Sequence, residues 1–314
     1  MESPGDLKPK LSIIVPALGG YRATLAAIDS WEAQSCRDQL EILVLCPKTR
    51  DLGPIPDGQI LVETDGMDLH EARSAGVRNA RADYVVLAED HCLPDRGWAQ
   101  AVLNRLAEGW DVVGPALRSG NPVSSWTQAS FLLGYSQWMA PIEAGPALVL
   151  PGHNAVLRKD LLLAMDSELE RELLVAAFLL RRLRRQGHRF YLENQATMRH
   201  FDPAKRVRSL RIFVSVGLGF GALRTDSRGW IGRALYSLAA PAIAFRHWQR
   251  AAIHYRRAGA EGGLGPGCLL AAVPLALAWG LGESVGALMG VDRVTPLVSQ
   301  AEIKPVSKSD ACLK

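Results

Sequence analysis

Short apolar runs alternate with helical patterns from residue 11 to about residue 106, and this alternation constrains the fold most. Leu11 to Val15 is a β-branched run closed by Pro16, which predicts a strand. The next segment places Leu25, Ile28 and Trp31 on one helical face. The same alternation predicts strands at 42–45, 60–62 and 84–87 and helices at 69–80 and 97–106. Because the strands lack polar alternation, we expect them to be buried on both faces of a doubly wound, mainly parallel α/β sheet that binds ligands at its carboxyl edge.

The remaining residues up to about 203 are expected to complete this domain. They comprise a segment at 147–165, a long helix over 168–186 and two late edge strands at 190–192 and 196–198. After His200 the sequence becomes basic and apolar. The chain is therefore expected to divide into a polar tail (1–10), an α/β domain (11–203), a helical, membrane-associating region (204–290) and a polar, disordered tail (291–314).

Two apolar segments in the C-terminal region suggest contact with a membrane. The run at 235–245 is too short to span a bilayer, whereas 264–281 approaches the ~20 residues that a spanning helix needs and is expected to stop at Glu283. Pro266, Pro274 and several glycines leave a re-entrant or interfacial segment as an alternative. The arginine-rich connector Arg246 to Arg257 is expected to lie beside anionic headgroups, which predicts attachment to the cytoplasmic face of the cell membrane. The competing interpretation is that both segments are core helices of a soluble domain or a dimer interface.

Composition narrows the classes of function. The five cysteines are scattered and never form a C-x-x-C pair, so neither a disulfide framework nor a zinc site is expected, and a reducing, cytoplasmic setting fits best. The N-terminus is polar and lacks the apolar core of a signal peptide. Basic residues cluster at 181–189, 205–211 and 246–257, which indicates an anionic partner such as phosphate or lipid headgroups. A nucleic-acid partner is not expected, because aromatic residues are not interleaved with these basic runs.

The segment Tyr84 to Asp95 is the most informative stretch for chemistry. The predicted strand delivers Glu89, Asp90 and His91 together at its carboxyl end. Two carboxylates and an imidazole can hold Mg²⁺ or Mn²⁺, which would bridge the oxygens of a nucleotide diphosphate. The plain alternative is that these acidic residues only cap the following turn.

Three stretches of this chain, Leu11 to Pro16, Glu71 to Ala80 and Leu87 to Asp95, resemble the family 2 inverting glycosyltransferases of the GT-A fold. The resemblance covers about residues 11–200. It implies a nucleotide-sugar donor, a metal-binding acidic motif made by Glu89, Asp90 and His91, and donor contacts from Pro16, Arg73, Glu89 and Asp90.

Two further positions acquire roles through the resemblance. Leu150 to Arg158 looks like the segment that lines the sugar and acceptor cleft in that family. Gly152 permits a close approach of the backbone, and His153 and Asn154 can hydrogen-bond sugar hydroxyls, although a tight turn before a helix explains the same residues. His200 resembles the position at which a histidine completes the metal shell, so the implied ligands are Asp90, His91 and His200.

The chain departs from the family pattern in two places. The second strand ends in Val44 to Pro47 and offers no carboxylate for the nucleotide base, which leaves the donor open. The register of the usual catalytic carboxylate holds Val175 and Ala176. Glu172, one turn earlier, is the candidate base, and the alternative is that it belongs to a solvated, charged helix face.

These observations predict a metal-dependent inverting glycosyltransferase that moves a sugar from a nucleotide-sugar to an acceptor hydroxyl, with an acceptor glycan or a lipid-linked, membrane-borne acceptor. One alternative is a non-catalytic, membrane-bound sugar-binding or scaffold protein. A sugar-phosphate nucleotidylyltransferase is less favoured, because Pro16 to Gly20 lacks the basic residues of the glycine-rich loop in that class.

Overall fold

The computed structural model describes residues 8–47 and 58–302. Contacts between residues divide the chain into two compact units. The first unit comprises Met1–Ala116 and Glu143–Arg199, and the second comprises Leu117–Ile142 and His200–Lys314. The segment Leu117–Ile142, which the sequence placed in the α/β domain, therefore groups with the C-terminal helices.

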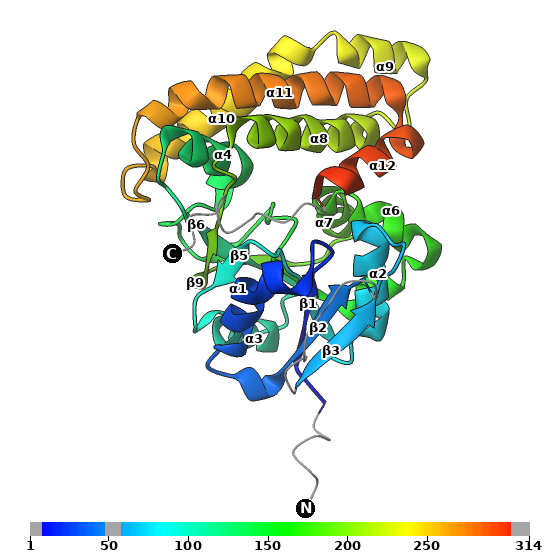
Figure 1. Cartoon of the computed structure of the whole chain (residues 1–314), viewed down its shortest axis with the longest axis vertical. Helices are drawn as coiled ribbons and strands as arrows, with labels where there is room; N and C mark the ends of the chain where they lie inside the picture. The colour runs from blue at the N-terminus through cyan, green and yellow to red at the C-terminus, as the bar shows by residue number, and fades with distance from the viewer. Residues whose placement is uncertain (1–7, 48–57, 303–314) are drawn as a thin grey trace, which may run out of the picture. The chain divides into compact units, whose positions relative to one another are not determined.

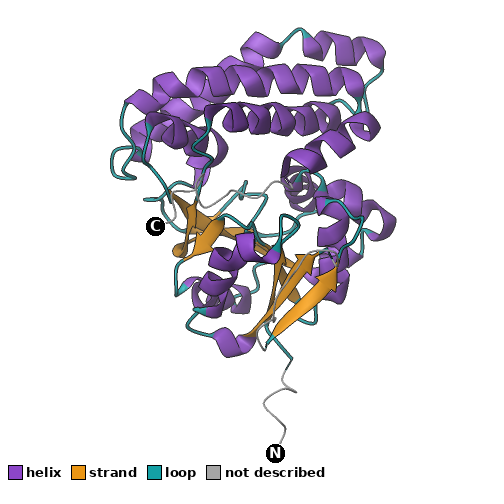
Figure 2. Ribbon diagram, viewed as in Figure 1, coloured by secondary structure: helices purple, strands orange, loops and turns teal. Residues whose placement is uncertain are grey.

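The described strands form one mixed, mainly parallel sheet of nine (Figure 2). Its order is β3-β2-β1-β4-β8-β6-β9-β5, and β7 pairs with β9. The pairs β1–β2, β2–β3 and β1–β4 are parallel, whereas β4–β8, β6–β8 and β7–β9 are antiparallel. The strands are β1 (Leu11–Pro16), β2 (Leu40–Cys46), β3 (Gln59–Glu63), β4 (Tyr84–Leu87), β5 (Cys92–Pro94), β6 (Val112–Ser119), β7 (Gly145–Pro146), β8 (Val156–Arg158) and β9 (Phe190–His200).

Helices cover the sheet of the first unit because its strands are apolar on both faces; β1 and β2 are buried along their whole length. Trp31 of α1 and Trp98 of α3 pack edge to face, with ring centroids 5.0 Å apart. Gly76 of α2 lies against Ile14 and Leu45, where a β-carbon would come within 2.6 Å of the Ile14 side chain. The helices of this unit are α1 (Tyr21–Glu32), α2 (Leu69–Asn79), α3 (Trp98–Ala107), α5 (Lys159–Leu163), α6 (Leu169–Leu173) and α7 (Ala176–Arg185), with 3-10 turns η1 (Arg37–Gln39) and η3 (Asp166–Glu168).

The predicted α/β class is confirmed, and its first four strands lie within one or two residues of the expected ranges. Two predictions were wrong. The long helix expected over 168–186 is broken into η3, α6 and α7, since Val175 adopts an extended conformation between the last two. The late edge strands at 190–192 and 196–198 are one strand, β9, which lies between β6 and β5 rather than at an edge.

The second unit is helical, and α8, α10 and α11 lie side by side (Figure 1). Glycines at four-residue spacing on α8 (Gly217, Gly221) and α11 (Gly282, Gly286) let these two backbones touch. A β-carbon at Gly221 would come within 1.9 Å of the Glu283 carbonyl oxygen. The helices are α4 (Ser125–Tyr135), α8 (Arg206–Arg224), α9 (Trp230–Ser237), α10 (Ala240–Ala258), α11 (Gly267–Met289) and α12 (Val291–Glu302), with η2 (Ser136–Trp138).

A polar cluster lies inside this helical unit. Glu283 of α11 is fully buried and accepts hydrogen bonds from Arg224 (2.7 Å) and Tyr236 (2.6 Å). His247 Nε2 lies 2.9 Å from the other oxygen of the same carboxylate. The expectation that Glu283 ends the apolar helix was wrong: α11 continues to Met289, because three neighbouring side chains satisfy the carboxylate.

Two other C-terminal expectations require correction. The start of the expected disordered tail is helix α12, in which Val291 and Val294 are buried; residues 303–314 lie outside the described part of the chain. The apolar run at 235–245 is not one segment, since it is shared between the end of α9 and the start of α10. Among the described residues, α11 is the one helix long and apolar enough to cross a membrane, and about half of it is buried within the unit.

Candidate metal and donor site

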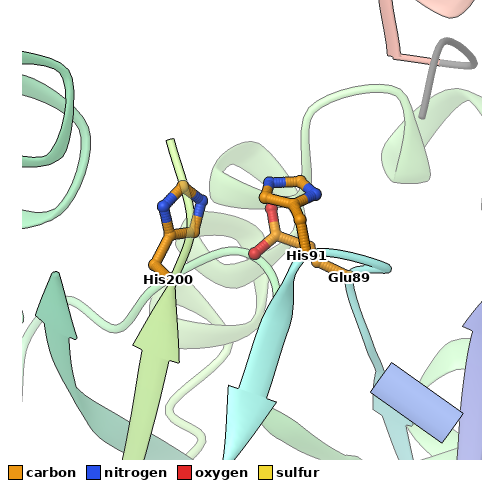
Figure 3. A group of neighbouring side chains, drawn as sticks. All are labelled: Glu89, His91 and His200. Atoms are coloured by element: carbon orange, nitrogen blue, oxygen red, sulfur yellow. The ribbon is translucent and has the colours of Figure 1, made fainter. Parts of the chain in front are cut away.

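The candidate site lies where β4 ends in the middle of the sheet. The Ala88 amide donates to the Ile14 carbonyl of β1, and the Asn154 amide donates to the Leu87 carbonyl of β4, so the residues after β4 are held on both sides. Glu89 and His91 follow β4 directly, and His200 is the last residue of β9 in the same sheet. One potential ligand atom from each of the three lies within 4.8 Å of the others (Figure 3).

Each of these three side chains is held by a polar neighbour. Asn154 binds Glu89 twice, accepting from the Glu89 amide (3.1 Å) and donating to its carboxylate (2.7 Å). His91 Nδ1 lies 2.7 Å from Asp90, and His200 Nδ1 lies 3.1 Å from Asp202. A carboxylate that accepts from Nδ1–H places the lone pair of the imidazole on Nε2, which is the usual arrangement of a metal-binding histidine.

The residues present fit a divalent metal ion. One carboxylate and two imidazoles are a recognised donor set for first-row transition metals, whereas Mg²⁺ prefers oxygen ligands. Of the two ions expected from the sequence, Mn²⁺ therefore suits this set better. Asp90, which was predicted as a ligand, lies beside the cluster as the partner of His91, and the carboxylate within the cluster is that of Glu89.

Arg73 lies near the carboxyl ends of β1 and β2. Because Gly76 sits over Ile14 and Leu45, Arg73 one turn earlier lies about 4.5 Å further along α2, toward the carboxyl ends of those strands. The Arg73 side chain is only 3% exposed, and its Nε has no hydrogen-bond partner in the described part of the chain. A buried guanidinium without full pairing is costly, so this position suits an anionic ligand. Pro16, the last residue of β1, is buried at the same edge.

The Gly152 to Asn154 segment connects the cluster to helix α7. A β-carbon at Gly152 would come within 3.0 Å of the Ala177 amide nitrogen, so this glycine allows close contact with the start of α7. His153 is half-buried between Gly152 and Asn154. Asn154 is fully buried and adopts a left-handed conformation, with φ of 62°.

Glu172 lies on α6 and is not part of the group formed by Glu89, His91 and His200. Its carboxylate is 2.8 Å from the guanidinium of Arg182, which also pairs with Glu168. Val175 and Ala176, at the register of the family's usual base, cap and begin α7. Gly152 therefore lies close to positions 175–176, where the family's usual base would be. Glu172 instead forms an ion pair with Arg182.

Three features of the site were missed in the sequence. The two anchoring bonds from Asn154 and the support of His200 by Asp202 were not expected, although the His-x-Asp spacing was a usable signal for the second. Thr64, directly after β3, and Ser74, next to Arg73, are buried hydroxyls without hydrogen-bond partners among the described residues. The Thr64 amide donates to the Cys46 carbonyl, which places Thr64 beside the end of β2.

A family model matches part of the chain. Residues 55–164 match the family described as glycosyl transferase family 2. No curated protein matches the chain. A solved structure of S. aureus TarS, residues 1–349, is similar with 14% sequence identity and a TM-score of 0.43, over 60% of this chain and 59% of that one. The chain thus spans about three fifths of that protein.

The region that matches glycosyl transferase family 2 therefore covers about a third of the chain and lies within the mainly parallel α/β sheet. The matched residues include α2 with Arg73, strand β4 with Glu89 to His91, and the Gly152 to Asn154 segment.

Proposed function

We propose that this protein is a metal-dependent inverting glycosyltransferase that uses a nucleotide-sugar donor. The observation that carries the proposal is the convergence of Glu89, His91 and His200, each with its own polar support. Glu89 and His91 lie inside the region that matches glycosyl transferase family 2, and His200 joins them from the end of β9. Inversion would follow from a single displacement, in which the acceptor hydroxyl attacks the anomeric carbon from the face opposite the leaving group.

The side chains at the carboxyl edge of the sheet have different roles in the proposed binding of the donor. Glu89, His91 and His200 would hold a divalent ion, which when bound offsets the negative charge that develops on the leaving nucleotide diphosphate. The buried Arg73 guanidinium supplies positive charge near the ends of β1 and β2. Asn154 fixes the Glu89 carboxylate by two hydrogen bonds, and His153 lies next to it, in reach of the sugar or acceptor hydroxyls in the proposed cleft.

The catalytic base remains Glu172 in this proposal. It must accept the proton of the attacking hydroxyl within hydrogen-bond distance, so the Arg182 pair has to open or shift when acceptor binds. The Glu172→Gln variant should keep metal-dependent donor binding and lose transfer. If that variant transfers sugar at the parent rate, Glu172 is not the base.

The proposal also includes attachment to the cytoplasmic face of the membrane and a membrane-borne or lipid-linked acceptor. Apolar side chains are exposed along α9 and along one face of α11 in the second unit. The most exposed of these in α11 are Leu270, Leu277, Leu281 and Leu288, which are between 56% and 79% exposed. Glu283, Gly282 and Gly286 of α11 lie against α8 instead, so the exposed stripe suits insertion into the interface rather than a helix surrounded by lipid.

The decisive experiment is a screen of nucleotide-sugars for thermal stabilisation of the full chain, with and without Mn²⁺. A true donor raises the melting temperature by mass action, and the rise should need the metal. The hit is then assayed for donor hydrolysis and transfer. Asp90→Asn should weaken metal-dependent stabilisation and abolish transfer, and His200→Ala should lower metal affinity. Asp29→Asn, which removes an exposed carboxylate on α1, is the matched control.

A second candidate function is favoured by one observation. Glu172 is paired with Arg182, and no carboxylate occupies positions 175–176, which suits a membrane-bound sugar-binding or scaffold protein without catalysis. Metal-dependent stabilisation by a nucleotide-sugar without hydrolysis or transfer would support that alternative. Absence of stabilisation by every donor tested would argue against both.

A further inference from the structure

A small cavity in the second unit combines two arginines with exposed apolar side chains. It has a volume of about 270 Å³ and is lined by Arg228, Trp230, Arg233, Ala234 and Leu288. These residues come from the turn before α9, from α9 itself and from the end of α11. None of them belongs to the proposed donor site.

The two arginines line the same cavity, and neither guanidinium forms an ion pair with a described residue. The Arg233 guanidinium donates to two backbone carbonyls, those of Arg228 (3.2 Å) and Asp226 (3.4 Å). The Arg228 guanidinium lies 5.7 Å from the centre of the Tyr236 ring, and its aliphatic stem covers Gly232. Two adjacent positive charges repel unless an anion shares them, so the cavity suits an anionic group.

The neighbouring Arg224 does not have this property. Its guanidinium is neutralised by the buried Glu283 carboxylate at 2.7 Å. The excess positive charge at this end of α9 therefore belongs to Arg228 and Arg233.

The surroundings of the cavity are apolar and exposed. Trp230 is 79% exposed and Leu288 is 58% exposed, and Leu235 of α9 and Leu238 at its C-terminal end are exposed as well. Helices α9 and α11 pack against each other, so the cavity lies beside the exposed stripe of α11. A phosphate site bounded by tryptophan and leucine matches the headgroup level of a bilayer, where tryptophan is enriched and acyl chains begin.

We propose that Arg228 and Arg233 bind the phosphate of an anionic phospholipid while Trp230, Leu288 and the α11 stripe enter the interface. This inference rests on the membrane association proposed above and adds a defined headgroup site to it. The occupant is a bilayer lipid rather than a free anion, because the apolar stripe between Leu270 and Leu288 extends roughly 27 Å along α11 and needs a partner as well.

The test is flotation of the purified full chain with vesicles of phosphatidylcholine alone and of phosphatidylcholine with phosphatidylglycerol. The parent should bind both and prefer the anionic vesicles. The double variant Arg228→Gln/Arg233→Gln should bind anionic vesicles on the order of thirty-fold more weakly and keep the parent's binding to neutral vesicles. The matched control Arg206→Gln/Arg211→Gln removes the same charge from the other end of α8, and it should lose less than threefold.

Several outcomes would overturn the proposal. An equal loss in both double variants means a diffuse charge effect without a headgroup site. Release of the parent by millimolar inorganic phosphate, but not by chloride at matched ionic strength, means a free-phosphate site. A stable dimer that binds no vesicle means that a second copy covers the apolar face. Equal binding of the parent to neutral and anionic vesicles would refute the headgroup site alone. No binding to any vesicle would refute the proposed membrane association as well. Sugar transfer is measured separately, on a soluble acceptor.

Discussion

At the level of single residues, Asn154 is the side chain on which the geometry of the candidate metal site depends most. It adopts a left-handed conformation that asparagine tolerates better than most residues, and its amide holds both the backbone and the carboxylate of Glu89. A glycine at this position would adopt the left-handed backbone conformation without strain. It would lack the amide side chain that forms the two hydrogen bonds with Glu89.

Two substitutions separate these roles. Asn154→Ala and Asn154→Gly should both weaken Mn²⁺ binding by about 10- to 100-fold, since both remove the amide that orients Glu89. The glycine variant should lose less stability, because glycine accepts a positive φ without strain. Mn²⁺ titration followed by thermal denaturation measures both effects. Parent-like Mn²⁺ affinity in the glycine variant would mean that the amide has no role in the site.

A second residue-level prediction concerns Glu41, which joins β1 to β2. It is 3% exposed and accepts hydrogen bonds from Ser12 and from the guanidinium of Arg81. Burial raises the pKa of Glu41, but its bonds with Ser12 and Arg81 outweigh this and the net pKa lies below the ordinary 4.5. A lowered pKa means that the carboxylate stabilises the fold above its unfolded pKa, and that this contribution is lost as pH falls through the folded pKa.

Glu41→Gln should therefore cost about 1–3 kcal/mol at neutral pH, and the loss should shrink as the pH is lowered below about 4.5. Urea denaturation at a series of pH values measures this difference. The control is Glu108→Gln, a half-exposed partner of Arg105, for which about 0.5 kcal/mol or less is expected at every pH. A difference between parent and Glu41→Gln that does not change with pH would contradict the assignment.

At the level of elements, the close contact between α8 and α11 depends on glycines, which carry no side chain. The sequence contains both Gly-x-x-x-Gly pairs, yet their spacing was not recognised as a helix contact. The pairs explain why Glu283 is buried: close packing of the two backbones brings its carboxylate within reach of Arg224. A helix that appeared from composition to end at a charge therefore continues through it.

Gly221→Ala should destabilise the second unit by about 2 kcal/mol or more, because its methyl group would overlap the Glu283 carbonyl. Gly134→Ala in α4, where no atom lies within 4 Å of the added carbon, should instead be neutral or stabilise by about 0.4–1 kcal/mol. Thermal denaturation of the full chain compares the two variants. Equal melting temperatures would show that α8 and α11 do not pack through these glycines.

At the level of the whole molecule, the division of the chain into two units decides how membrane association should be tested. Helix α4 packs against α10 and α11, so removing the residues after 203 would expose the apolar side of α4. Surface substitutions in the full chain are therefore a cleaner experiment than truncation.

Leu277 and Leu281 are 56% and 58% exposed on the α11 stripe. Leu277→Gln/Leu281→Gln should shift the protein from the membrane fraction toward the soluble fraction by on the order of tenfold or more, because each leucine contributes about 1.5–3 kcal/mol when fully buried in an apolar phase. Cell fractionation at low salt measures the shift, and circular dichroism checks the fold. Leu25→Gln on α1, 37% exposed, is the control in the first unit. Recovery of the parent itself in the soluble fraction without detergent would refute the anchor.

The sequence by itself determined the α/β class, the first four strands and the acidic segment after β4, because continuous apolar runs and strand-end carboxylates are local signals. It did not predict the supports of the metal cluster, since Glu89 and Asn154 lie 65 positions apart and β4 and β9 become neighbours of the same site only through the sheet. It also assigned residues 117–142 to the α/β domain, whereas their contacts group them with the C-terminal helices, and it ended the apolar segment at Glu283, inside α11. Only tertiary packing decides such matters: the free energy of a buried charge or a bare glycine depends on which distant residues lie against it.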